Sequence, residues 1–125
     1  MTIPYRLHPG QKDQPPVDTI HEVRIDSPSK KAFQSLAKAQ RLSMRAALTQ
    51  LIEQHAEIRE CFSPRRPRPW AGIASTQRCP YDAALPEVEV STSASMALLI
   101  DANHAGIRLT EAVRQLVWRC VQASE

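Results

Sequence analysis

The sequence is poor in glycine, in aromatic residues and in cysteine. Among 125 residues there are three glycines and three cysteines, and aromatic residues make up 5% of the chain. With so few glycines there is no Gly-rich loop to hold a phosphate group. Cys61, Cys79 and Cys120 are odd in number and lack C-x-x-C spacing, which argues against a disulfide framework and against a zinc site. A single Cys61–Cys79 bridge is the alternative that the spacing leaves open.

Long apolar runs are also missing. No stretch approaches the roughly 18 apolar residues that span a membrane. The first six residues, Met1-Thr2-Ile3-Pro4-Tyr5-Arg6, lack the apolar core of a signal peptide. We therefore expect a cytoplasmic protein without a membrane partner.

The four histidines show no catalytic pattern. His8, His21, His55 and His104 have no carboxylate or cysteine at the spacing of a ligand set or a catalytic pair. We therefore expect no enzyme activity, no metal and no cofactor. His55 is interpreted as a histidine at the edge of a core, on a helix.

Positive charge is concentrated in one part of the chain. The net charge is only +3, but residues 59–78 contain five arginines against Glu60 alone. Residues 20–58 contain six basic and four acidic groups, whereas residues 87–125 contain three basic and five acidic groups. This distribution is compatible with phosphate contact by the middle and the first part of the chain.

Proline divides the chain into two compact segments. Residues 1–19 contain four prolines and few apolar residues, and we expect them to form an extended N-terminal arm. Residues 59–86 include the run Pro64-Arg65-Arg66-Pro67-Arg68-Pro69, which favours neither a helix nor a central strand, because proline lacks an amide donor. We expect a basic, Pro-rich linker there, between compact segments at 20–58 and 87–125.

The two compact segments resemble each other at a constant offset of 65 residues. Apolar positions coincide over the whole length, and we therefore interpret the chain as a tandem repeat. The identical pairs are Glu22/Glu87, Val23/Val88, Ala32/Ala97, Ala37/Ala102, Ala47/Ala112, Gln50/Gln115 and Leu51/Leu116.

Each repeat is predicted to begin with one strand. Residues 22–26 and 87–91 alternate apolar and polar side chains, which is typical of a half-buried strand. Signals for a helix start follow at Ser27-Pro28 and at Thr92-Ser93. Gly106 marks the end of this first helix in the second repeat.

The second helix of each repeat is predicted to be amphipathic. Its start differs between the repeats, since Ser43 supplies a capping hydroxyl in one and Glu111 supplies the third-position carboxylate in the other. The inner faces are formed by residues at helical spacing. They comprise Met44, Ala47, Leu48, Leu51, Ile52 and His55, and Leu109, Ala112, Val113, Leu116, Val117 and Cys120.

One strand and two helices within about 35 residues cannot close a core by themselves, because the strand keeps two unpaired edges. Two such units can do so by pairing their strands and interlocking their helices. We therefore predict a mainly helical fold with a two-stranded antiparallel ribbon, in which Val23–Ile25 pairs with Val88–Val90. The two repeats would form one compact unit, a monomeric pseudo-dimer.

This pattern resembles the ribbon-helix-helix family of DNA-binding proteins. The most similar stretch, residues 105–114, looks like the inter-helix turn and second helix of that family, and residues 41–48 are less similar. Tandem copies in one chain resemble accessory proteins of conjugative DNA transfer, such as TraY-type relaxosome proteins. They also resemble the tandem ribbon-helix-helix protein of the virulence C operon in T-DNA transfer, especially at Ser27-Pro28-Ser29-Lys30 and in the Pro-containing linker.

The resemblance implies double-stranded DNA as the partner, with a relaxase or other transfer proteins as further partners. In the family, the ribbon enters the major groove and its outward side chains read base edges. Alternation with the buried positions makes these side chains Glu22, Arg24, Asp26, Glu87, Glu89 and Ser91. Four of the six are acidic, where the family's pattern is basic or amide. The acidic residues favour an alternative in which the chain binds a protein, as antitoxins do.

The resemblance also places phosphates at the start of the second helices. It implies contacts from Ser43, Arg45, Arg108 and Thr110. We expect further phosphate contacts from Lys30, Lys31, Arg65, Arg66 and Arg68. Because the two strands differ in sequence, we expect an asymmetric target, such as an origin of transfer. A transcriptional repressor with a promoter target would use the same mechanics.

Overall fold

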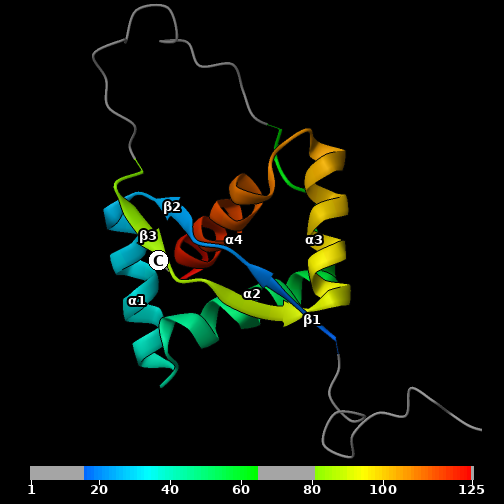
Figure 1. Ribbon diagram of the computed structural model, residues 1–125. Coiled ribbons are helices and arrows are strands. Elements are labelled where there is room, and N and C mark those ends of the chain that lie inside the picture. The colour runs from blue at the N-terminus through cyan, green and yellow to red at the C-terminus, as the bar shows by residue number, and fades with distance from the viewer. Residues whose placement is uncertain (1–15, 65–80, 125) are drawn as a thin grey trace, which may run out of the picture.

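The computed structural model describes residues 16–64, here called the first half, and residues 81–124, the second half. Each half has two short strands followed by two helices (Figure 1). The mainly helical fold with an antiparallel ribbon is therefore confirmed. The elements are β1 (Val17–Ile20), β2 (Val23–Ile25), α1 (Ser27–Ala39), α2 (Met44–Ile58), β3 (Ala83–Leu85), β4 (Val88–Ser91), α3 (Thr92–Ala105) and α4 (Leu109–Ala123).

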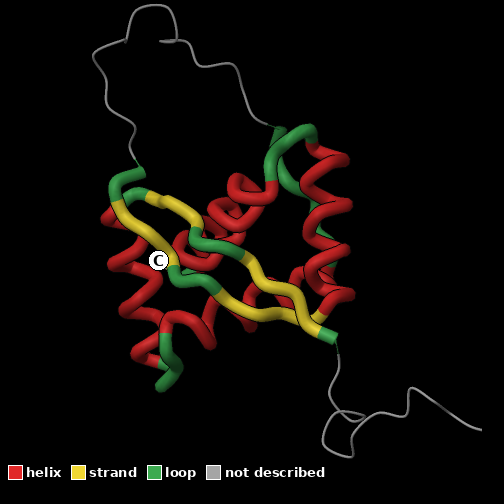
Figure 2. Tube along the Cα trace, in the orientation of Figure 1, coloured by secondary structure: helices red, strands yellow, loops and turns green. Residues whose placement is uncertain are grey.

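The four strands form one long two-stranded ribbon. β1 pairs with β4 and β2 pairs with β3, both antiparallel. Ile20 lies opposite Val88, and Val23 lies opposite Leu85. Moving three residues forward from Ile20 thus corresponds to moving three residues back from Val88, so the register is continuous across both pairs of strands. The ribbon is interrupted only at residues 21–22 and 86–87, and it runs diagonally across one side of the molecule (Figure 2).

The predicted pairing of Val23–Ile25 with Val88–Val90 is wrong, because β2 pairs with Ala83–Leu85 instead. The ribbon is longer than the alternating runs suggested, since β1 and β3 extend it at both ends. The expected boundaries of the arm and of the linker therefore fall inside the ribbon. These extra strands follow from backbone hydrogen bonds that the opposite half supplies, which is a non-local effect.

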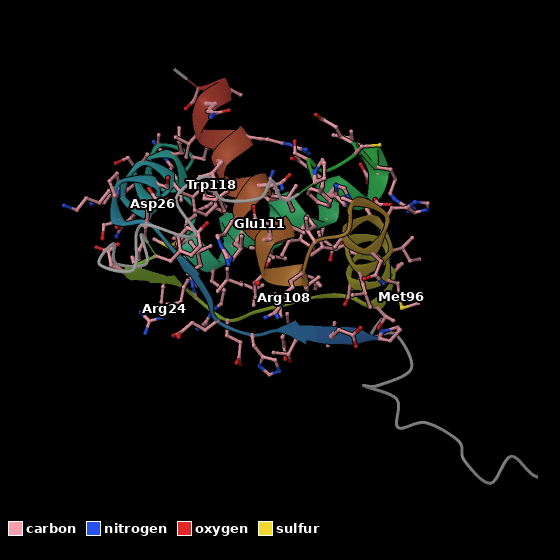
Figure 3. The ribbon with its side chains drawn as sticks, turned by 90° about the horizontal axis from the view of Figure 1, so that it is seen from above. Arg24, Asp26, Met96, Arg108, Glu111 and Trp118 are labelled. Atoms are coloured by element: carbon pink, nitrogen blue, oxygen red, sulfur yellow. The ribbon has the colours of Figure 1, made fainter. Side chains whose placement is uncertain are left out.

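All four helices lie on one side of the ribbon (Figure 3). The helices of each half pack on the other half, with α1 against α4, α2 against α3, α2 against β4, and α4 against β2. The inward side chains of the ribbon join them in one core of buried residues. Of the helices in residues 16–64 and 81–124, none has the length and apolar character needed to cross a membrane.

Two of the predicted helix signals are found in place. The Ser43 hydroxyl caps α2 by accepting from the Ala46 N–H at 3.0 Å. Gly106 ends α3 with φ of 71°. The corresponding residue after α1 is Arg41, which has φ of 62°. Both turns also close with equivalent backbone bonds, Leu42 N–H to Ala37 O at 2.8 Å and Ile107 N–H to Ala102 O at 3.0 Å.

The starts of the first helices differ from the prediction. α1 is capped by Asp26, which accepts from the Ser29 N–H at 3.0 Å, and not by Ser27. α3 is capped by Ser91, which accepts from the Ala94 N–H at 3.2 Å, and not by Thr92 or Ser93. In both halves the last residue of the alternating run is therefore the N-cap of the following helix, since its side chain accepts a hydrogen bond from a first-turn N–H group.

Candidate nucleic-acid interface

The outer face of the ribbon is the first surface that the sequence predicted. Figure 3 shows Arg24 on the side of the ribbon away from the helices. Within the ribbon Arg24 lies opposite Ala84, and Thr19 lies opposite Glu89. We call this surface the ribbon face and define it by its outward residues. They are Thr19, His21, Glu22, Arg24, Ala84, Glu87 and Glu89.

The ribbon face is acidic. Glu22, Glu87 and Glu89 are exposed, and Arg24 is the permanent cation among the residues of this face. His21 Nδ1 lies 3.4 Å from Glu87 Oε1, and the two side chains are 86% and 59% exposed. Because both groups are so well solvated, their interaction stabilises the fold little. The four predicted ribbon residues on this face thus bring three carboxylates and one guanidinium.

Asp26 and Ser91 do not belong to the ribbon face, and their predicted outward position is wrong. Asp26 accepts from the Trp118 indole N–H at 3.0 Å in addition to its capping bond. Ser91 donates its hydroxyl to one Glu53 oxygen at 2.9 Å and its N–H to the other at 2.7 Å. Each cap is thereby tied to the second helix of the opposite half.

These two ties are equivalent under the offset of 65 residues, which relates Asp26 to Ser91 and Glu53 to Trp118. The direction of the hydrogen bond is reversed between them, since Asp26 accepts from Trp118 whereas Ser91 donates to Glu53. Partial burial acts to raise the pKa of Asp26, but the hydrogen bonds from Ser29 and Trp118 outweigh it, so the pKa is lowered. Asp26 is therefore held in its ionised, accepting form.

A groove of about 620 Å³ lies between the ribbon, α1 and the start of α2. It brings Lys30, Ser43 and Arg45, three of the predicted phosphate contacts, next to Glu22 of the ribbon face. We call it the Lys30 groove. Its lining residues are Glu22, Lys30, Gln34, Ser43, Met44, Arg45, Ala84, Leu85 and Pro86.

The first turn of α2 adds to the positive potential of the Lys30 groove. The Ser43 hydroxyl accepts a hydrogen bond from the Ala46 N–H. The N–H groups of Met44 and Arg45, in the first turn, have no acceptor within the helix. Helix N-termini carry a partial positive charge and attract anions. With Lys30 and Arg45, the groove offers two side-chain cations and two backbone donors at one place.

The corresponding surface of the second half is less basic. Ser95 stands where Lys30 is, and Thr110 stands where Arg45 is. Arg108 occupies the N-cap of α4 without a capping hydrogen bond from its side chain, and Figure 3 shows it at the end of α4 near the ribbon. Arg108 and Thr110 are exposed. This half therefore provides one cation where the first provides two.

The remaining predicted phosphate contacts lie elsewhere. Lys31 is exposed on α1 but does not line the Lys30 groove. Arg65, Arg66 and Arg68 lie outside the described residues. Thr19, Ala84 and Gln34 were not predicted as site residues from the sequence. For Thr19 and Ala84 no local signal existed, because their strands are created by pairing with the opposite half.

A partly buried ionic cluster joins α2 and the end of the first half to α3 of the second half. His55 Nε2 lies 2.8 Å from Asp101 Oδ2, and Arg59 donates to both oxygens of Asp101 at 2.7 and 2.8 Å. The His55 ring stacks on Phe62 with centroids 4.8 Å apart. The hydrogen bonds from Arg59 lower the pKa of Asp101 to about 2, with His55 adding to the effect against the opposing influence of burial. We call this group the Asp101 clamp.

The Asp101 clamp shows that the prediction of no carboxylate partner for the histidines is wrong for His55. His55 is 3% exposed, as expected for a histidine at a core edge. However, it does have a carboxylate partner, 46 residues away in the sequence. In the parts of the chain that the structure describes, no group of three or more His, Cys, Asp or Glu side chains is placed to hold a metal ion. Comparison of the chain with protein-family models, curated proteins and solved structures finds no match.

Proposed function

We propose that this protein is a tandem ribbon-helix-helix pseudo-dimer that binds double-stranded DNA. The ribbon would enter the major groove with its ribbon face toward the bases. The Lys30 groove and the start of α4 would contact the phosphates on either side. The observation that carries the proposal is the arrangement of an exposed two-stranded ribbon with cations and helix N-termini beside it.

The repeated element order supports the proposal. Each half contributes two strands and two helices in the same order, and the helices of each half pack on the other half. A two-stranded ribbon is narrow enough for the major groove, which is about 12 Å wide. Hydrogen bonds also attach the two ends of the ribbon to the helices, from Asp26 to α4 and from Ser91 to α2.

The halves would make unequal contributions to affinity. The first half presents Lys30 and Arg45 beside its helix start, whereas the second presents Arg108. Phosphate contacts supply most of the salt-dependent affinity of a DNA-binding protein. We therefore propose an asymmetric target site, such as an origin of transfer, with the stronger phosphate contacts on the side of the first half. A role in conjugative or T-DNA transfer and a role as a repressor differ in the DNA fragment that binds.

A second candidate function is the binding of a protein partner through the ribbon face. Glu22, Glu87 and Glu89 favour it, because carboxylates near phosphates are repelled. Glutamate can accept a hydrogen bond from cytosine, so the carboxylates are compatible with base reading in the major groove. A basic partner surface would be complementary to the ribbon face without any contribution from the Lys30 groove.

The test is a titration of fluorescently labelled plasmid-origin and promoter fragments between 50 and 200 mM salt. DNA binding through phosphates predicts a steep, linear fall of the logarithm of affinity with the logarithm of salt concentration. Arg45→Ala removes one cation of the Lys30 groove and should weaken binding by about tenfold while reducing the salt slope by about one.

Lys38→Ala is the matched control, because Lys38 is an exposed lysine of α1 that does not line the Lys30 groove. It should leave the slope within about 0.3 of the original protein. Equal effects of the two variants would remove the groove from the proposal. No binding of any fragment at 50 mM salt would leave the protein-binding function as the better candidate.

A further inference from the structure

The two strands of the ribbon are related by an internal two-fold symmetry. Thr19 lies opposite Glu89, and Arg24 lies opposite Ala84. The offset of 65 residues relates Arg24 to Glu89, and it relates the residues opposite them in the same way. A pseudo-two-fold axis therefore passes through the middle of the ribbon, and equivalent positions of the ribbon face lie at equal distances from it.

Arg24 and Glu89 break this symmetry in charge. They occupy equivalent positions of the ribbon face, and both side chains are exposed. Within residues 16–64 and 81–124, neither takes part in an ion pair, so both charges are available to a ligand. Glu22 and Glu87, which are also equivalent, are identical. The difference in permanent charge between the two halves of the ribbon face therefore lies at Arg24 and Glu89.

The two side chains fit opposite bases of a G·C pair in the major groove. Arginine has parallel N–H donors that match the O6 and N7 acceptors of guanine. A carboxylate has only acceptors, and it accepts from the amino group of cytosine. Guanine presents only acceptors to it, and adenine places the N7 acceptor beside its amino group. Arg24 therefore fits guanine, whereas Glu89 fits cytosine.

We propose that Arg24 and Glu89 make the target site non-palindromic, by reading guanine in one half-site and cytosine at the equivalent position of the other. This inference rests on the proposed function, because it requires that the ribbon face meets the base edges. In a palindrome the equivalent positions of the two DNA strands carry the same base. Here they carry complementary bases, so one DNA strand has guanine at both positions.

The length of the ribbon determines how far apart the two bases lie. Arg24 is five residues along the strand from Thr19, the residue opposite Glu89, which corresponds to about 17 Å. Successive base pairs are about 3.4 Å apart along the DNA. The two bases are therefore separated by roughly five base pairs, and a window of about 12 base pairs contains both.

Selection from a library of DNA duplexes, randomised over that window, tests the inference with the full chain. The original protein should enrich sites with guanine at two positions of one strand. Glu89→Arg should change the preferred base at its position from cytosine to guanine by at least about tenfold, which makes these two positions palindromic. Arg24→Glu should produce the converse palindromic site, with cytosine at both contacted positions.

Glu57→Arg is the matched control, because it makes the same change of charge at an exposed position of α2, outside the ribbon face. It should raise the affinity for all sequences alike and leave the enriched site unchanged. Circular dichroism of each variant verifies that the fold is intact.

The outcomes separate base reading from DNA binding itself. If Glu89→Arg enriched the same site as the original protein, or if the original protein enriched a palindrome at these positions, the inference would be overturned. Salt-dependent binding would then still support the proposed function. If no duplex bound at 50 mM salt, the inference and the proposed function would both be overturned.

Discussion

The two halves of this protein share many buried positions and differ in most of their exposed side chains. Phe33 and Leu98, or Ala37 and Ala102, fill the same places in the core, all at most 3% exposed. The inter-repeat ties, by contrast, have changed partners. Leu36, Cys120 and Ser124 occupy the positions in the other half that correspond to Asp101, His55 and Arg59, so the ionic cluster has no counterpart there.

This difference teaches which interactions the fold requires. Both halves must contribute apolar residues to the shared core, because neither half can bury its strands and helices alone. The polar contacts between the halves need not be symmetric, because the Asp101 clamp is formed on one side alone. Exposed side chains are not constrained in this way, and there the first half has the Lys30 groove whereas α3 of the second half has exposed Met96, Leu99 and Ile100.

The largest effects should come from the shared core. Phe33→Ala should cost about 3–5 kcal/mol of unfolding free energy and Leu98→Ala about 2–5 kcal/mol, since each leaves a cavity at a buried position. Because the core is common, either change should lower a single unfolding transition of the whole protein. Urea unfolding followed by circular dichroism and by Trp118 fluorescence, in a Trp70→Phe background, measures this.

The decisive measurement is the unfolding midpoint reported by Trp118 fluorescence in the Phe33→Ala variant. Trp118 lies in the second half, whereas the substitution lies in the first half. Both probes should report the same shifted midpoint. Gln34→Ala, at the exposed neighbouring position, should change stability by less than about 0.5 kcal/mol. If the midpoint reported by Trp118 fluorescence were unchanged in Phe33→Ala, the two halves would unfold independently of each other.

The next largest effect should come from the Asp101 clamp. Asp101→Asn should cost about 1 kcal/mol at pH 7, because it removes the charged hydrogen bonds from Arg59, whose 45% exposed side chain is partly screened by solvent. The pKa of Asp101 is lowered from 3.8 to about 2 in the folded protein. Its contribution is therefore complete above about pH 4 and is lost as the pH falls toward 2.

Urea unfolding between pH 2 and pH 7 measures this dependence. Asp101→Asn should flatten the loss of stability below pH 4, whereas Glu57→Gln, at an exposed position of α2, should leave its shape unchanged. An acid profile that is identical in Asp101→Asn and the original protein would assign the dependence to other carboxylates, such as Asp26.

The smallest effect should distinguish the turns after α1 and α3. Arg41 adopts φ of 62° and Gly106 φ of 71°, a region that costs a residue with a Cβ about 1–2 kcal/mol. Part of this cost is offset by the greater entropy that glycine loses on folding. Arg41→Gly should thus stabilise the protein, and Gly106→Ala destabilise it, each by about 0.5–1 kcal/mol.

No heavy atom beyond the chain neighbours lies within 4 Å of a Cβ added at Gly106, so its substitution tests backbone conformation without a clash. Thermal unfolding of both variants shows whether each substitution raises or lowers the stability of the protein. A destabilised Arg41→Gly would show that the Arg41 side chain contributes more than its backbone strain costs.

Several features of the fold could be predicted from local patterns. The burial of Val23 and Val90 follows from alternation in short runs, since strand side chains point to opposite faces in turn. The cap at Ser43 and the stop at Gly106 depend on residues within one helical turn. The offset of 65 residues correctly related equivalent positions even where the side chains differ, as for Arg41 and Gly106.

Other features of the candidate site could not be predicted in this way. Lys30, Ser43 and Arg45 were selected singly, and only the packing of α1 beside the start of α2 and the ribbon makes them one groove with Glu22. Asp26 and Ser91 fit the strand pattern, yet they turn to cap α1 and α3 because a bond across the interface holds each of them.

The amino-acid sequence by itself determined the helices, the repeat and the composition of the core, because these depend on propensity and periodicity within a few residues. Only the tertiary structure decided the length and register of the ribbon and the partner of His55. Those depend on residues that are distant in the chain, and pairing between distant residues leaves no local signal.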